Sequence, residues 1–364
     1  MWWLNRKLRS ERGASAVLVA ILLVPLLGFV AIAVDVGALY AERAQLQNGA
    51  DAAALAIARD CQDGVCTDPA GAAARFTNDN ANDGAANVLA PVINMADKTV
   101  TVTDSTRVAG TNAGAISHPF ARFIGVDSTT AGAAATAQWG SPGSGKVLAL
   151  ALSWCEFQES LAASGNHVTV RTDTNKICKH APSEEVIPGG FGWLDNSSTC
   201  MATINLSLNL DANKQLWLGS DPGGSVNTDC KSKLESLKGT TVLVPIYDRV
   251  RGTGTNAEYR IFAFAGFTIT GWNFPSTQVL DPLAPLCPPA APAAPKGPTD
   301  PKGPKGPTDP KGPTDPKPPK PCDESDKSNN WNGIQGFFKE WVSVDGAFGL
   351  GGPELNAKFV KLIK

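Results

Sequence analysis

The residues best suited to chemistry are the eight cysteines, all of which follow a long apolar stretch near the N-terminus. They are Cys61, Cys66, Cys155, Cys178, Cys200, Cys230, Cys287 and Cys322. An even number of cysteines confined to one side of an apolar segment is typical of disulfides formed in an oxidising compartment. Metal binding is the competing use, but the spacings are irregular, no paired C-x-x-C motif occurs and the chain has only three histidines. We therefore predict disulfides and no metal site.

Two cysteine pairs are suggested by what lies between their members. Cys61 and Cys66 bracket Gln-Asp-Gly-Val, a tight loop that a disulfide can close. Cys287 and Cys322 flank a proline-rich tract, and a disulfide between them would pinch the base of that tract. The connectivity of the remaining cysteines stays open, because sequence alone does not determine it.

A possible nucleotide site is the segment from Gly140 to Lys146, which satisfies the G-x-x-x-x-G-K part of a phosphate-binding loop. The motif continues with Ser or Thr to hold magnesium, whereas Val147 stands here and no helical pattern follows. A flexible linker between two outer domains explains the same residues better, so we expect no nucleotide partner.

Motifs of other catalytic and binding classes are incomplete. There is no G-x-S-x-G, and His118, His167 and His180 show no recognisable pairing with a nucleophile. The run VLALALS lacks the aspartate with which a von Willebrand A-type domain would begin its metal site. The cluster TNDNANDG has Asp83 where a calcium loop needs glycine, so it is interpreted as a turn. We expect a protein that is not an enzyme and has no cofactor.

The overall charge excludes another class of partner. The formal net charge is −2, so no basic field indicates binding to nucleic acid. Most tryptophans are interpreted as core or sheet packing, with a carbohydrate-binding platform as the alternative.

The element that places all these residues is an apolar stretch that begins at Ala14, ends at Val34 and contains no charged residue. About 20 apolar residues in a helix cross the hydrocarbon core of a bilayer. The preceding tail is basic, with Arg6, Lys7, Arg9 and Arg12 opposed only by Glu11. By the positive-inside rule this tail stays in the cytoplasm. We therefore predict a single-pass anchor in the cell membrane, with the lipid bilayer as a partner and the bulk of the chain extracytoplasmic.

Two alternatives compete with a membrane span. A secretory signal peptide also begins with basic residues, and Ala31-Ile32-Ala33 resembles a cleavage site, but the apolar run is long for that role. A buried core helix is disfavoured because the run is apolar on every side.

The helical pattern continues well beyond the apolar stretch. Apolar residues recur at steps of three and four as far as Ile57, and no proline stands between Pro25 and Pro69. One helix from about Ser15 to Arg59 is therefore predicted. Its outer half is rich in alanine, and this face could pack either on the protein's own strands or on helices of other subunits.

The rest of the chain is predicted to be mostly β. Alternating and β-branched runs indicate strands at residues 98–108 and at many places beyond Val147. Proline occurs at every third position from Pro292 to Pro319, which is the polyproline II repeat and predicts a semi-rigid arm. After this arm a strand pattern resumes, and we expect it to return to the sheet that contains the segment YRIFAFAGFTITGWNF.

The N-terminal segment resembles the Tad-like domain of Flp pilus-assembly proteins, the TadE/TadG-like group. The matching features are Arg12-Gly13, the central Pro25, the run AVDVG around Asp35, and QLQN followed by ADAAAL. The resemblance is close over about the first 60 residues and looser to about residue 140. Leu18 stands where prepilins carry a glutamate, so we expect a permanently anchored protein.

The resemblance implies a pilin-like, membrane-anchored component of tight-adherence (Flp-type) pilus assembly, acting with other pilus-assembly or pilin subunits. The alternative is a cell-surface adhesin or binding module with a proline-rich spacer. We expect an α+β fold with a long transmembrane helix and a disulfide-stabilised, mostly β outer region with a polyproline arm. The expected divisions are a basic tail (1–13), the span (14–34), a helix extension with a small α+β domain (35–140), a β-rich domain (141–287), the spacer (288–321) and C-terminal strands returning to the β domain (322–364).

Overall fold

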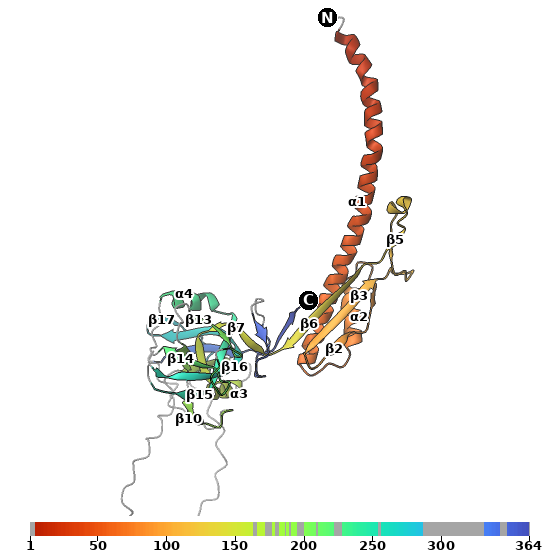
Figure 1. Cartoon of the computed structure of the whole chain (residues 1–364). Helices are drawn as coiled ribbons and strands as arrows, with labels where there is room; N and C mark the ends of the chain where they lie inside the picture. The colour runs from red at the N-terminus through yellow and green to blue at the C-terminus, as the bar shows by residue number, and fades with distance from the viewer. Residues whose placement is uncertain are drawn as a thin grey trace, which may run out of the picture. The chain divides into compact units, whose positions relative to one another are not determined.

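The computed structural model describes residues 4–162, 166–171, 177–178, 182–185, 187–188, 191–194, 200–208, 210–221, 228–253, 256–286, 331–342 and 348–363. The chain forms two compact units, one from Met1–Trp139 with Val360–Lys364 and the other from Gly140–Phe359 (Figure 1). The first begins with a long helix and the second is mostly β, so the predicted α+β fold is confirmed. The proposed polyproline arm lies outside the described residues.

The first helix, α1, extends from Leu4–Gln62 and is 59 residues long. At a rise of 1.5 Å per residue it measures about 90 Å, roughly three times the hydrocarbon thickness of a bilayer. Two residues after its end stands Gly64, which has a positive φ of 76°. The amide of Gly64 donates to the carbonyl of Cys61 at 3.1 Å. Glycine is favoured there because it has no Cβ to oppose a positive φ. The helix is therefore long enough to cross a membrane and still build a domain beyond it.

The C-terminal half of α1 packs with helix α2 (Pro69–Asn80) on a sheet of five strands. These strands are β1 (Ala86–Val88), β2 (Val92–Asn94), β3 (Thr99–Thr106), β6 (Gly132–Gly140) and β20 (Phe359–Leu362). Their order is β1-β3-β6-β20, with β2 also paired to β3. Residues alternate along β3, so that Val100 and Val102 are fully buried while the threonines between them are not. This alternation fixes which face of the sheet meets the helices.

The alanine-rich face of α1 lies inside this first unit. Ala50, Ala53, Ala54 and Ala58 are completely buried in one cluster with Val100 and Val102 of β3. Of the two alternatives left open by the sequence, packing on the protein's own strands is therefore the one that the structure supports. Small side chains allow the helix to approach the sheet and α2 closely.

A hairpin leaves the same unit between β3 and β6. It consists of β4 (Ile116–Ser117), a short 3₁₀ helix η1 (Ala121–Ile124) and β5 (Ser128–Thr129). Strands β4 and β5 pair with each other in antiparallel fashion, and η1 contacts α1. Figure 1 shows this hairpin beside α1, at the opposite end of the unit from β2.

The second unit contains the remaining elements. They are β7 (Pro142–Leu148), β8 (Leu150–Ser153), α3 (Trp154–Ala162), β9 (Val168–Arg171), β10 (Ile177–Cys178), β11 (Ile187–Pro188), β12 (Phe191–Leu194), β13 (Met201–Asn205), β14 (Trp217–Asp221), α4 (Thr228–Leu237), β15 (Thr241–Arg251), β16 (Glu258–Phe274), β17 (Thr277–Val279), β18 (Gly333–Phe338) and β19 (Gly349–Leu350).

The main sheet of the second unit has the order β14-β12-β8-β15-β16-β18-β9. Strand β14 pairs with both β12 and β16, so part of this sheet closes on itself. Strand β8 runs parallel to β15, whereas β15 and β16 form a long antiparallel pair. Both faces carry apolar clusters, one containing Trp272 and Phe267 and the other Tyr247 and Phe264. Burial on both faces explains the near-continuous apolar runs in these strands.

The segment from Gly140 to Lys146, interpreted above as a flexible linker, is instead part of strands β6 and β7. Strand β7 pairs with β13 and β19, so its backbone is held on both sides. A Cβ on Gly143 would lie 2.7 Å from the amide nitrogen of Gly352. The glycines that imitate a phosphate-binding loop therefore allow close approach of neighbouring backbone, which composition alone does not distinguish from flexibility.

The C-terminal strands divide between the two units. Strand β18 pairs with β16, the strand to which we expected the chain to return. Strand β20, in contrast, joins β6 in the sheet of the first unit rather than the β domain. The apolar positions Phe359 and Val360 suit either sheet, and only the tertiary fold selects the edge of β6.

Among the described residues no cysteine is free. Cys61 is bonded to Cys66, which closes the turn after α1, and Cys200 is bonded to Cys230 in the core of the second unit. Cys155 is also disulfide-bonded. Cys287 and Cys322 lie outside the described residues, so their suggested pairing stays a prediction.

Candidate functional site

The most unusual surface of this protein is the apolar part of α1. Its large side chains are exposed on every side of the helix, with Val24 and Phe29 each 71% exposed. A window of this helix has a mean hydropathy of 3.1 and none of it is buried by the rest of the chain. Exposed apolar patches of this size mark an interaction surface, and this length and composition fit a bilayer. The helix fits a membrane-anchored protein.

The apolar part of α1 ends at a buried carboxylate. Asp35, the first residue after the predicted span, is only 3% exposed. One of its oxygens, Oδ2, accepts hydrogen bonds from the backbone amides of Phe120 at 3.0 Å and Ala121 at 2.5 Å. These amides begin η1, where free N–H groups and the positive end of a helix favour an anionic acceptor. Asp35 therefore attaches the β4–β5 hairpin to α1 at the C-terminal end of the apolar stretch.

The residues that Asp35 holds form a compact loop, which we call the tip loop (residues 119–126). The amide of Gly125 donates to the carbonyl of Arg122 at 3.1 Å, and that of Val126 donates to Ala121 at 3.1 Å. His118 at its base is 5% exposed, and its Nε2 hydrogen-bonds to Oγ1 of Thr129 at 2.8 Å. The loop is thus ordered by backbone bonds, although its own apolar side chains do not enter the core.

Acidic side chains gather where α1 meets β3. Asp104 on β3 is 1% exposed, and burial raises its pKa to about 7, with the nearby carboxylates of Glu42 and Asp51 adding to the shift. Burial and the charge of Asp83 likewise raise the pKa of Glu42. Such groups favour the neutral form because charge is poorly solvated there. They make the junction of helix and sheet sensitive to pH.

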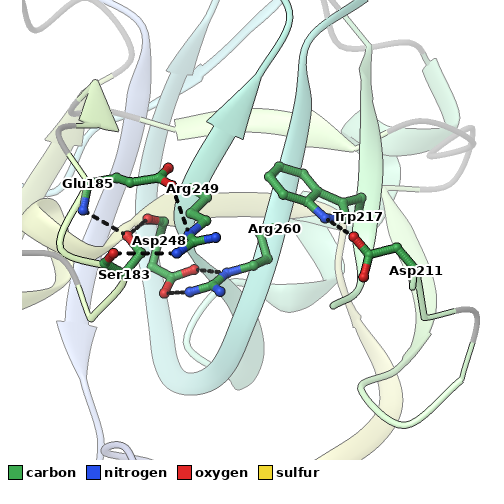
Figure 2. Close-up of polar contacts among 7 residues, drawn as sticks. All are labelled: Ser183, Glu185, Asp211, Trp217, Asp248, Arg249 and Arg260. Atoms are coloured by element: carbon green, nitrogen blue, oxygen red, sulfur yellow. Dashed lines mark hydrogen bonds and ion pairs between the residues drawn. The ribbon is translucent and has the colours of Figure 1, made fainter. Parts of the chain in front are cut away.

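In the second unit, a polar cluster lies on β15 and β16 (Figure 2). Asp248 is completely buried and receives both Nε and Nη2 of Arg260, the first at 2.6 Å. Oγ of Ser183 donates to the backbone carbonyl of Asp248 at 2.6 Å, and Arg249 pairs with Glu185 at 3.3 Å. These bonds tie residues 182–185 to the sheet. The arrangement pairs each charge with its opposite, which is what a buried ion pair requires.

Other polar groups near this cluster are also paired within the fold, and Figure 2 includes two of them, Asp211 and Trp217. Nε1 of Trp217 donates to Oδ2 of Asp211 at 3.0 Å, and the guanidinium of Arg251 lies 4.3 Å from the centre of the Trp217 ring. Hydrogen bonds from the backbone of Gln215 lower the pKa of Asp211. Burial raises the pKa of Tyr247 far above its ordinary range, so its phenol stays neutral. None of these groups is placed as a nucleophile beside a base.

A second polar network involves a histidine that sequence analysis singled out. Oδ2 of Asp281 contacts both His167 and the hydroxyl of Thr270, and its backbone amide donates to Oε1 of Gln335 at 2.8 Å. Nε2 of Gln335 donates in turn to Thr169 at 3.0 Å. This network joins the segment after β17 to strands β9, β16 and β18. His180 lies outside the described residues.

Within the described residues, the structure brings none of the sequence motifs together as a reaction centre. Among the described residues, no group of three or more His, Cys, Asp or Glu side chains is arranged to hold a metal ion. The interaction surface of α1 and the tip loop is therefore the candidate site. Sequence analysis found the long helix and a short helix over residues 118–126, where η1 lies, but assigned no binding role to the tip loop or to Asp35. Two features of the sequence could have indicated this site: the aspartate directly after the apolar stretch and the apolar, aromatic run HPFARFIGV.

These features define a protein with one apolar N-terminal helix of membrane-spanning length and a domain built on its continuation. Residues 13–60 match the family model described as putative Flp pilus-assembly TadE/G-like. The match covers the apolar stretch, Asp35 and the alanine face, and confirms the resemblance predicted from the sequence. No curated protein and no solved structure matches the chain.

Proposed function

We propose that this protein is a membrane-anchored, non-enzymatic component of Flp-type pilus assembly. The family match supports involvement in Flp pilus assembly. The observation that carries the proposal is that α1 has two different halves, both of which lie mostly in the matched segment of residues 13–60. Its first half exposes apolar side chains, and its second half is the core of the first unit.

This division assigns a task to each half of the helix. The exposed half enters the bilayer, where it can also pack against helices of other pilus subunits. The buried half is continuous with it, so any movement of the span is carried directly into the first unit. In this proposal the basic tail faces the cytoplasm and both units lie outside it, where the disulfides form.

The proposal is tested by deleting the gene in the cell that encodes it and measuring sheared pili and surface attachment. We expect both to be lost and both to be restored by the wild-type chain. A second complementing chain carries an unrelated apolar span in place of residues 15–34. It separates simple anchoring, which restores pili, from specific docking of the helix, which does not.

An adhesin would behave differently in the same experiment. Deletion would abolish attachment while the amount of sheared pili stays unchanged, and that result would overturn the proposal. Membrane fractionation of each complementing chain serves as the control, because a chain that fails to reach the membrane tests neither function.

A further inference from the structure

The tip loop exposes large apolar side chains, two of them for more than two thirds of their surface. Phe123 is 78% exposed and Ile124 is 69% exposed, with Phe120 at 43% and Val126 at 44%. These four exposed apolar residues lie within seven consecutive positions of one ordered loop. In a soluble protein a patch of this kind marks a place where another surface binds.

The position of the tip loop indicates which surface that is. Asp35 holds the loop through two amides, and Asp35 directly follows the apolar stretch of α1. The exposed apolar side chains of the loop are thus attached where the uncharged apolar stretch of the helix ends. If α1 spans the bilayer, the loop lies at the level of the outer headgroups.

The composition of the tip loop matches that level. Aromatic side chains are enriched at membrane interfaces, where the ring enters the apolar region and polar groups stay near water. The loop also carries Arg122, whose guanidinium lies 5.3 Å from the centre of the Phe123 ring. A basic side chain beside apolar ones can meet lipid phosphates while its stem and neighbours are buried.

We infer that the tip loop inserts into the outer interface of the bilayer as a second membrane contact beside α1. A single helix leaves the attached domain free to rotate about the helix axis and to tilt. A second contact away from that axis restricts both motions. The first unit is thereby held in one orientation on the membrane. This inference rests on the proposed anchoring by α1.

The test uses the full-length protein, one copy per lipid nanodisc, so that no second protein is present. A spin label is placed at Phe123→Cys and, in a matched variant, at Val92→Cys. Val92 is an apolar residue of the same unit with 68% exposure, on β2 at the opposite end from the hairpin. The ratio of collision rates with oxygen and with a water-soluble nickel complex reports the depth of each label.

We expect this ratio to be several-fold higher at residue 123 than at residue 92. Adding Asp35→Ala should lower the ratio at 123 towards that at 92 and increase the mobility of the label. Hydrogen exchange of β3 serves as the control that the first unit remains folded in each variant.

Equal, water-like ratios at both positions would overturn the inference. So would a label at 123 that is exposed in nanodiscs and becomes protected only in native membranes, because the loop would then bind a protein. Insertion of α1 is measured separately, by flotation of the same samples with lipid. Failure of the tip loop to insert therefore remains distinguishable from failure of the anchor.

Discussion

A Cβ placed on Gly49 of α1 would lie 2.9 Å from the α-carbon of Thr77 on α2. The two helices therefore meet at a point where the backbone of one leaves no room for a side chain on the other. Thr77 is 1% exposed and its hydroxyl donates to the carbonyl of Ala73 at 2.8 Å, so it cannot readily move aside.

Gly49→Ala should destabilise the first unit by about 1–3 kcal/mol, because overpacking forces the backbone to shift. Gly37→Ala is the matched control in the same helix, since nothing lies within 4 Å of a Cβ there. Alanine is the better helix former, so the control should be neutral or slightly stabilising. Hydrogen exchange of α2 and β3 peptides measures both. Equal protection in the two variants would contradict this reading of the contact.

Asp104 should make the first unit less stable as the pH rises from about 4 to about 7. Burial raises its pKa to about 7, so in this window the folded state keeps a proton that the unfolded state releases. The contribution of Asp104 to the free energy of unfolding is greatest below about pH 4. It falls by on the order of 3 kcal/mol as the pH rises to about 7, and it does not change further above that pH.

Asp104→Asn removes the titrating group and should flatten that pH dependence. Hydrogen exchange of β3 at a series of pH values, corrected for intrinsic exchange rates, provides the measurement. Asp97, an exposed aspartate on the turn before β3, is the control position. If Asp97→Asn and Asp104→Asn leave the same slope, Asp104 is not the responsible group.

Arg260→Ala should destabilise the second unit by about 3–5 kcal/mol, because it leaves the buried carboxylate of Asp248 without its partner. Arg251→Ala breaks an exposed pair with Glu258, in which the side chains are 51% and 40% exposed. The cost there should be about 0–1 kcal/mol for the ion pair and about 0.5–1 kcal/mol for the contact of Arg251 with the Trp217 ring. Protection of β15 and β16 amides in the two variants compares them directly. Comparable losses would show that burial does not govern the strength of these pairs.

The orientation of the chain is open to a labelling experiment. We expect Ala113→Cys, in an exposed loop of the first unit, to react with a membrane-impermeant maleimide on intact spheroplasts. Asn5→Cys, in the basic tail, should react only after the membrane is opened. The wild-type chain measures the background from its own cysteines. Labelling of residue 5 on intact spheroplasts would reverse the predicted topology.

Sequence analysis predicted the long helix well because its pattern is local. Apolar composition and the three-and-four spacing persist from Ala14 to Ile57, and α1 contains that whole stretch. The strand around Val100 was found for the same reason, because alternation over several residues reflects one buried face. Residues that act over long separations were harder to find. Asp35 and Ala121 are far apart in the chain, and no local pattern joins them.

The incorrect linker at residues 140–146 has a physical explanation. Gly and Ser are frequent both in flexible segments and where strands pack very closely. Gly143 belongs to the second case, but its neighbour Gly352 is distant in sequence. The placement of β18 and β20 in different sheets could not be predicted either. Strand β20 is separated from β6 by the whole second unit, and no local pattern indicates that the two strands pair.

The pairing of β20 with β6 also determines the order in which the protein is completed. Strand β6 is made before the whole second unit, and β20 only after it. Until β20 is made and pairs, β6 presents an unpaired edge, which other extended chains can join. In the proposed topology, residues 140–358 are exported before β20 can complete the sheet of the first unit, and a chain halted within them exposes a site for premature association.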